Sequence, residues 1–278
     1  MKLNLECSAV ITGASRGIGR HIAHQLASRQ VKLVLAARNE QDLNDIKQEL
    51  SVYNNPVYVI KTDVLNKNDL HNLYDKSIAA YGSIDILVNN AGIEAIQNYD
   101  SLSGKLIEQI ISVNLTAPML LSQLFLNHMQ HQNSGHIVNI ASAAGMFPPP
   151  FSEPYAASKA GLIAFTHSLR MSLKQQNSHV SSSAITPGFV DGEGMYENGK
   201  SLGGEAPWYV GSIPIHKVAT AVINAIEKDI PEQVLVPGIP KVAKTLQLFF
   251  PKGFETVSKK LNLFKTLVEV AKTREQVS

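Results

Sequence analysis

Short apolar runs alternate along most of the chain with longer stretches in which apolar residues recur every three or four positions. The short runs are rich in Val and Ile without strict polar alternation, which is typical of strands covered on both faces. The longer stretches have the period of amphipathic helices, so the alternation predicts an α/β fold with a single doubly wound parallel sheet and helices on both faces. The predicted strands are Ser8–Thr12, Lys32–Ala37, Val57–Thr62, Ile84–Val88, His136–Ile140, Val180–Ile185 and Gln233–Val236. The predicted helices are Gly19–Arg29, Gln41–Leu50, Lys67–Tyr81, Lys105–Gln130, Pro154–Gln176 and Ile215–Lys228.

The alternation ends near Gly238, which predicts a sheet domain over residues 1–238 and a helical extension over residues 239–278. Before this boundary, Asp191–Pro214 is rich in Gly and poor in pattern and is expected to be a mobile loop. In the extension, Pro251-Lys252-Gly253 interrupts the helical spacing, so one short amphipathic helix is expected on each side. The apolar positions are Val242, Leu246, Phe249 and Phe250, then Phe254, Val257, Leu261, Phe264, Val268 and Ala271.

The extension is also basic: residues 239–278 hold eight Lys and Arg against three Glu, a net charge of +5, which leaves −3 for the rest of the chain. A basic amphipathic helix can lie in an anionic membrane interface. It can equally cover a substrate pocket, pack on another subunit, or dock on the protein's own core. All of these roles stay open, and a membrane role would favour a lipid-like substrate.

Overall composition adds little bias toward a particular partner. The 278 residues are 44% hydrophobic with a net charge of +2, which gives no sign of nucleic-acid binding. The one cysteine, Cys7, excludes an intrachain disulfide and favours a reducing compartment. No run reaches the roughly 18 consecutive apolar residues of a membrane span, and the scattered histidines predict no metal site. A cytoplasmic protein is expected, either free or peripheral to a membrane.

A glycine-rich turn follows the first predicted strand and opens the first helix, in the order Thr12-Gly13-Ala14-Ser15-Arg16-Gly17-Ile18-Gly19. Glycines allow a sharp turn and a close approach of backbone to a pyrophosphate. The following helix offers free N–H groups and the positive end of its dipole. This position in the first strand–helix unit predicts a dinucleotide site that includes Gly13, Ser15, Arg16, Gly17, Ile18 and Gly19.

Together with further motifs, this Gly-x3-Gly-x-Gly spacing resembles the short-chain dehydrogenase/reductase family, from about Lys2 to Gly238. The other motifs are Asn89-Asn90-Ala91-Gly92, Ser112-Val113-Asn114, Ser142, Tyr155-Ala156-Ala157-Ser158-Lys159 and Pro187-Gly188, in the family's order and spacing. The resemblance implies a Rossmann-type fold and a nicotinamide dinucleotide cofactor. It also implies a homodimer or homotetramer built through the long helices Lys105–Gln130 and Pro154–Gln176.

The second predicted strand ends at Ala36-Ala37-Arg38, where an acid would bind a ribose hydroxyl and an Arg accommodates a 2′-phosphate. A guanidinium binds phosphate in bidentate fashion, so Arg38 and Arg16 together favour NADP(H). By resemblance, Asp63-Val64 contacts the adenine, Asn90 lies against the adenosine ribose, and Pro187-Gly188 belongs to the cofactor site. The Thr that many family members carry after the Pro-Gly pair is missing here.

Tyr155 and Lys159 are four residues apart on a predicted helix and therefore share a face. A nearby cation stabilises a phenolate, which suits a tyrosine to reversible proton transfer. We therefore predict Tyr155 as the general acid/base and Lys159 as the residue that lowers its pKa. By resemblance, Lys159 also binds the nicotinamide ribose, Ser142 orients the substrate oxygen, and Asn114 anchors a water relay.

These residues predict an oxidoreductase that transfers hydride between NADP(H) and a carbonyl or secondary alcohol, a ketoreductase on an apolar or acyl-type substrate. An oxidising hydroxysteroid or alcohol dehydrogenase uses the same machinery. A catalytically silent NADP-binding sensor or scaffold is the alternative from another class, although it has no need of all four catalytic residues. Trp208 and Tyr209 are candidates to line the substrate site or to pack within their own loop.

Overall fold

The computed structural model describes residues 1–193, 197, 206, 211–236, 249–260, 262 and 264–277, with the backbone alone for 274–277. The predicted boundary at Gly238 and the aromatic pair Trp208 and Tyr209 lie outside these residues.

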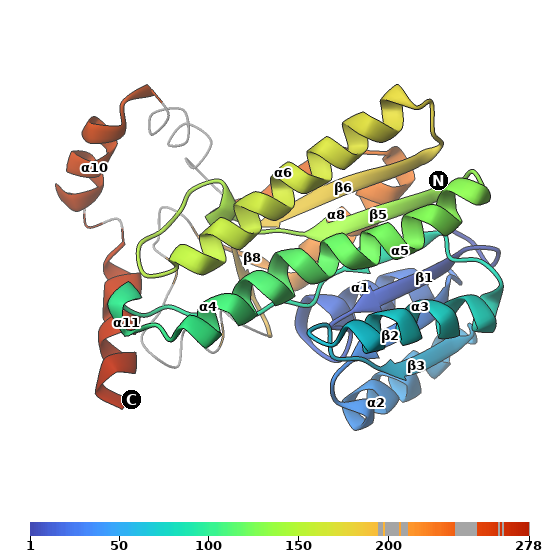
Figure 1. Cartoon of the computed structure of the whole chain (residues 1–278). Helices are drawn as coiled ribbons and strands as arrows, with labels where there is room; N and C mark the ends of the chain where they lie inside the picture. The colour runs from blue at the N-terminus through green and yellow to red at the C-terminus, as the bar shows by residue number, and fades with distance from the viewer. Residues whose placement is uncertain are drawn as a thin grey trace.

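Seven parallel strands form the main sheet in the order β3-β2-β1-β4-β5-β6-β9 (Figure 1). The order reverses between β1 and β4, which is the topological switch point where doubly wound folds bind their ligands, outside the carboxyl ends of the strands. The strands are β1 (Ser8–Thr12), β2 (Lys32–Ala37), β3 (Val57–Lys61), β4 (Ile86–Asn89), β5 (Gly135–Ile140), β6 (Val180–Pro187) and β9 (Glu232–Leu235). The predicted doubly wound parallel sheet is therefore confirmed, with strand ends shifted by one or two residues.

Helices cover both faces of this sheet. One core cluster joins the sheet to α1 (Gly17–Ala27), α2 (Glu40–Leu50) and α8 (Ile215–Lys228). The other joins it to α3 (Lys67–Tyr81), α5 (Ala117–His131) and α6 (Glu153–Gln175). Successive strand residues divide between the two clusters, as with Ile11 and Val10 of β1, because side chains alternate along a strand. This is why the strands are apolar throughout.

The predicted helix Lys105–Gln130 is continuous but not uniform. It consists of α4 (Gly104–Ile111), the π-helical turn η3 (Ser112–Thr116) and α5. By length and composition Gly104–His131 could cross a membrane. Its residues Phe125 and Met129 are instead fully buried in the protein core, which identifies a core helix.

The expected mobile loop Asp191–Pro214 is partly wrong, because its ends are ordered. Strand β7 (Phe189–Asp191) pairs in parallel with β8 (Ser212–Pro214) to form a second, two-stranded sheet. The two ends of the predicted loop have extended backbone, and they pair with each other only once the chain has folded.

The break predicted in the C-terminal extension falls one residue earlier than expected, because Phe249 is helical and Phe250 lies outside regular structure. Pro251 begins helix α10 (Pro251–Lys260), as a proline can in a first turn, and α11 (Lys265–Val277) follows. Helix α11 docks on the body: Val270 and Ala271 are buried, and with Leu267 they pack against Ile96 and Phe151. In Figure 1, α10 stands away from the sheet and its covering helices.

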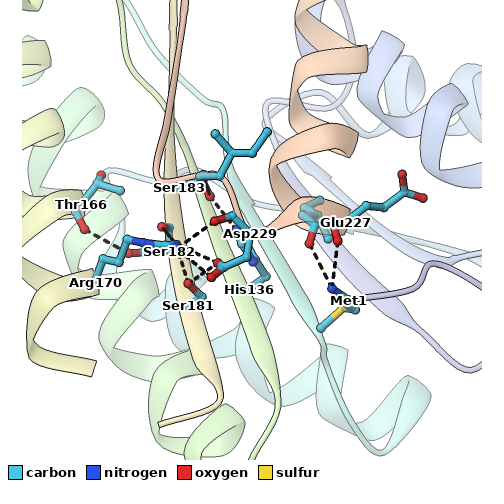
Figure 2. A network of polar contacts seen from close by, with 11 residues as sticks. Met1, His136, Thr166, Arg170, Ser181, Ser182, Ser183, Glu227 and Asp229 are labelled. Atoms are coloured by element: carbon cyan, nitrogen blue, oxygen red, sulfur yellow. Dashed lines mark hydrogen bonds and ion pairs between the residues drawn. The ribbon is translucent and has the colours of Figure 1, made fainter. Parts of the chain in front are cut away.

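A polar network ties the amino-terminal edge of β5 and β6 to α6 and α8 (Figure 2). Arg170, which is only 6% exposed, donates to both carboxylate oxygens of Asp229 at 2.7 and 2.8 Å. His136 Nε2 lies 2.8 Å from Ser183 Oγ, which itself donates to the Ile230 carbonyl. Nε2 therefore carries the imidazole proton. The network lies at the edge opposite the carboxyl ends of the strands, so it stabilises the sheet without touching the site described next.

Candidate active site

The glycine turn packs too closely for any side chain at its key positions. A Cβ on Gly19 would lie 2.2 Å from the Gly13 carbonyl oxygen, and a Cβ on Gly13 would lie 2.9 Å from Ala91 Cα. Gly13 and Gly17 also have φ values of +63° and +58°, a region that side chains disfavour. The turn therefore brings bare backbone to the amino terminus of α1.

Two polar residues fix this turn against the end of β4. Asn90 Nδ2 donates to the carbonyls of Thr12 and Gly13, both at 3.0 Å. Thr12 Oγ1 accepts from the backbone N–H groups of Asn90 and Ala91. The Asn90 side-chain amide, which the sequence analysis expected against the adenosine ribose, thus holds the glycine turn. Thr12 is a positioning residue that the sequence analysis did not identify. The feature of the sequence that could have indicated this role is a hydroxyl side chain, that of Thr12, at the end of a buried strand.

The amino terminus of α1 already holds a carboxylate. Glu193 Oε2 accepts from Gly17 N at 3.1 Å, and its Oε1 accepts from Arg20 Nη1 at 3.0 Å. A carboxylate oxygen here stands in for a phosphate oxygen, since both are anions accepting from a helix terminus. The cradle thus fits the pyrophosphate of a dinucleotide, and Glu193 is a site residue that sequence reasoning did not identify.

The two predicted phosphate-binding arginines emerge from touching segments. Ala14 N donates to the Ala36 carbonyl at 3.2 Å, so the glycine turn contacts the end of β2. Arg16 and Arg38 each follow two residues later, and both side chains are exposed. Within the described part of the chain neither makes an ion pair. They are therefore available to an anionic group beside the turn.

The remaining predicted cofactor residues are held by the fold in several ways. Asp63 Oδ1 accepts from Leu65 N at 3.0 Å in the loop after β3, and the Val64 side chain packs on the core. The Ile18 side chain packs on the core cluster of the other sheet face, and the Ile18 backbone stays in the glycine turn. Gly188 N donates to the Leu235 carbonyl, and a Cβ there would lie 2.9 Å from Val236. The glycine at position 188 is therefore required by packing against β9, next to Pro187.

Tyr155 lies in the first turns of α6, with its phenol near the hydroxyl of Ser142, which follows β5. Burial and then the charge of the Glu94 carboxylate raise the pKa of the Tyr155 phenol, while the Ser142 hydrogen bond acts in the opposite direction. Ser142 also accepts from Ala144 N at 3.2 Å, which orients its side chain. The phenol is thus protonated at neutral pH and faces a second hydroxyl.

Lys159 lies one turn after Tyr155 and is 4% exposed. Its Nζ donates to the Ile140 carbonyl at 2.8 Å and lies 5.8 Å from the centre of the Tyr155 ring. Burial lowers the pKa of Lys159 to about 8, an effect that the Glu94 carboxylate opposes. A cation at this distance favours the phenolate electrostatically, but the pKa of Tyr155 is raised by burial and Glu94, so its lowering by Lys159 stays a prediction.

Asn114 is fully buried in the π-helical turn η3. Its Oδ1 accepts from Ile93 N at 2.9 Å, and its Nδ2 donates to the Ile93 carbonyl and to Ser158 Oγ. Ser158 Oγ in turn donates to the Tyr155 carbonyl at 2.7 Å. Asn114 therefore links the segment after β4 to the catalytic helix, and Ser158 is a further positioning residue that sequence reasoning missed.

The surroundings of the Tyr155 ring are apolar. It packs with Ile93, Leu106 and Ile107 against a small cluster of buried residues that includes Ala95 and Ile110. An apolar wall beside paired hydroxyls suits a substrate whose single polar group is placed at Tyr155 and Ser142.

Fold and site together define a class: a doubly wound α/β protein with a glycine-rich turn at the switch point of its sheet and a tyrosine–lysine pair beside the end of β5. A family model described as short chain dehydrogenase matches residues 8–201. The chain is 36% identical over 228 residues to the ketoacyl reductase HetN of Nostoc sp., covering 82% of this chain and 78% of that protein. The chain belongs to the short-chain dehydrogenase family and is an oxidoreductase.

Solved structures agree with this assignment. A metagenomic short-chain oxidoreductase in complex with NADP is 28% identical with a TM-score of 0.72, covering 86% of this chain and 100% of that chain. A short-chain dehydrogenase/reductase of Burkholderia phymatum in complex with NAD is 28% identical with a TM-score of 0.76, covering 84% and 90%. Related proteins of this fold thus bind either dinucleotide.

Proposed function

We propose that this protein is an NADPH-dependent ketoreductase that reduces an apolar or acyl-type ketone to a secondary alcohol. The observation that carries the proposal is the Tyr155–Ser142 hydroxyl pair, with Lys159 beneath the tyrosine and an apolar cluster around it. The ketoacyl reductase HetN, at 36% identity, supports the same direction and substrate class.

NADP(H) is the favoured dinucleotide because Arg16 and Arg38 stand exposed where the glycine turn meets the end of β2. A ribose 2′-phosphate at this place gains two guanidinium partners, whereas a 2′-hydroxyl has no carboxylate to bind. When bound, the cofactor supplies the hydride to the carbonyl carbon. The glycine turn and α1 hold its pyrophosphate, and Asp63 and Val64 lie on the adenine side.

Proton transfer falls to this chain's own residues. Ser142 and Tyr155 bind the carbonyl oxygen, and Tyr155 Oη gives it a proton as the C=O π bond breaks. Tyr155 is protonated before the reaction, as a donor must be, but burial and the Glu94 carboxylate raise its pKa and so make proton release harder. Stabilisation of the phenolate by the Lys159 cation is what proton transfer therefore requires. Lys159 stabilises the resulting phenolate, and solvent restores the proton by way of Lys159, with Asn114 anchoring that path.

The test is NADPH oxidation followed at 340 nm with a panel of ketones graded in chain length, including 3-oxoacyl thioesters. Turnover with NADPH and at least tenfold weaker binding of NADH are expected. Arg38→Asp should reverse the cofactor preference, whereas Arg29→Asp, two residues after the end of α1, should not. Absence of turnover with every ketone, or equal affinity of the wild type for the two dinucleotides, would contradict the proposal.

A further inference from the structure

Helix α10 and the two residues before it present apolar side chains to solvent. Phe249 and Phe250 are 68% and 66% exposed, and Val257 is 50% exposed. Phe250 directly precedes α10, and its carbonyl accepts from Phe254 N at 2.9 Å. Phe250, Phe254 and Val257, spaced four and three residues apart, therefore lie on one side of the first turns. Large aromatic side chains with this exposure are costly in water and mark a surface that meets another phase or molecule.

The rest of α10 and the start of α11 are cationic. Lys252, Lys259 and Lys260 are exposed around α10, and Lys265 is 72% exposed at the start of α11. Glu255 is the only acid among residues 249–260, and Glu269 is paired with Lys265 at 3.7 Å. Lysines beside exposed Phe residues form the pattern of a helix that lies in an anionic lipid interface.

Helix α11 connects this surface to the active-site edge. It packs Leu267, Val270 and Ala271 against Ile96 and Phe151. Ile96 follows the segment that Asn114 holds, and Phe151 lies between Ser142 and Tyr155 in the sequence, with its carbonyl accepting from Gln97 N. In Figure 1 α10 lies above α11 on the same side of the molecule, away from the sheet. A surface that holds α10 therefore also lies beside the loops around the catalytic residues.

We propose that residues 249–260, which are α10 and the two residues before it, dock the protein with the start of α11 on an anionic lipid bilayer. The Phe249, Phe250 and Val257 side chains lie in the interface and the lysines among the headgroups. Resting on the proposed function, this placement names the substrate class: long-chain ketones that partition into lipid and reach Tyr155 from the α11 side. The net charge of +5 over residues 239–278 matches an anionic surface, and the −3 of the remaining chain turns the body away from it.

The experiment measures co-sedimentation of the full-length protein with vesicles of phosphatidylglycerol and phosphatidylcholine, and with vesicles of phosphatidylcholine alone. Binding is expected to the anionic vesicles and to weaken as salt rises, because surface charges are screened. Each lysine near the surface contributes about fivefold in affinity. The triple variant Lys252→Gln, Lys259→Gln and Lys260→Gln should therefore bind about a hundredfold more weakly.

Matched variants separate the α10 surface from general effects. Phe250→Ser with Val257→Ser should abolish binding, whereas Leu5→Ser with Val52→Ser, at 52% and 73% exposed positions elsewhere, should not. The charge control replaces Lys2, Lys47 and Lys67 by Gln and should bind as the wild type does. Circular dichroism and thermal unfolding establish that each variant is folded.

Three results would overturn the docking proposal. One is a full-length protein that ignores anionic vesicles, and another is binding that the α10 variants leave unchanged. The third is an α10 variant that lowers the oligomeric state in size-exclusion chromatography without lipid, because the face would then join copies of this chain. If vesicles are bound but no ketone is reduced, the docking stands and the proposed function fails. If short soluble ketones are reduced but vesicles are not bound, the proposed function stands and the docking proposal fails.

Discussion

At the scale of single residues, the site depends on charges and protons that the fold places beside one another. Burial and the Glu94 carboxylate raise the pKa of the Tyr155 phenol, and Lys159 Nζ lies 5.8 Å from the ring centre, where its charge favours the phenolate. At the other end of the cofactor cradle, Glu193 occupies the α1 terminus where a phosphate is expected. Each arrangement makes a specific prediction.

Tyr155→Phe removes the proton donor and keeps the ring in its apolar packing. Ketone reduction should fall by about a thousandfold or more, within the range of acid/base catalysis. NADPH affinity, measured by fluorescence titration, should change less than about twofold because the glycine turn is untouched. Tyr58→Phe, a 53% exposed tyrosine on β3, is the matched control. Substantial turnover by Tyr155→Phe would remove the assigned role.

Glu193→Gln removes a negative charge from the place where the cofactor pyrophosphate is expected to bind. Two anions cannot share the α1 terminus, so the wild-type carboxylate must leave as the cofactor enters. The variant should bind NADPH about three to tenfold more tightly, the size of a charge effect at a helix terminus.

Glu49→Gln is the control for this experiment, because Glu49 also pairs with Arg20, at 2.9 Å, but makes no contact with Gly17. It should leave NADPH affinity unchanged. Weaker NADPH binding by Glu193→Gln would mean that the carboxylate assists the cofactor rather than competing with it.

At the scale of elements, the site is built where regular structure is interrupted. The glycine turn joins β1 to α1, and the π-helical turn η3 places Asn114 within reach of Ile93 and Ser158. π-Helical turns within longer helices are frequently found at functional sites. Both interruptions leave little room for change.

Gly19→Ala tests the glycine turn as a unit. Its Cβ would lie 2.2 Å from the Gly13 carbonyl oxygen, so the turn must open. We expect a loss of about 2 kcal/mol in the free energy of unfolding and a loss of measurable NADPH binding. Gly104→Ala is the matched control, since nothing lies within 4 Å of its Cβ. Normal NADPH titration by Gly19→Ala would show that the turn does not need this close packing.

At the scale of the whole molecule, the two edges of the sheet have separate tasks. The carboxyl edge carries the residues proposed to bind the cofactor and to catalyse the reaction, while the network of His136, Arg170 and Asp229 joins β5, β6, α6 and α8 at the other edge. Hydrogen bonds from Arg170 and Ser181 outweigh the effect of burial and lower the pKa of the Asp229 carboxyl. This network makes global stability depend on pH.

Burial lowers the pKa of His136 to about 4 from 6.5, with the Asp229 carboxylate opposing and Arg170 reinforcing this shift. Between these two values the unfolded chain binds a proton that the folded chain does not, so stability is complete above pH 6.5 and falls as pH decreases toward 4. The loss amounts to about 3 kcal/mol. Urea unfolding of wild type and His136→Gln over this pH range should show a shallower slope in the variant, whose side chain does not titrate. Equal slopes would exclude His136 as the source.

The amino-acid sequence by itself determined the sheet, the glycine turn and the shared helix face of Tyr155 and Lys159, because strand and helix periods, turn glycines and helical spacing are local properties. Asn114 and Ser142 were indicated by resemblance to the family, and the catalytic roles of all four stay predictions. Tertiary structure alone decided what depends on contacts distant in sequence. Examples are the Glu193 carboxylate at Gly17, 176 residues away, and the Asn90 amide on the glycine turn. The π-helical turn, the β7–β8 pair and the placement of α11 on Ile96 and Phe151 belong to the same group. Their energies come from partners that only the folded chain brings together, so no local pattern encodes them.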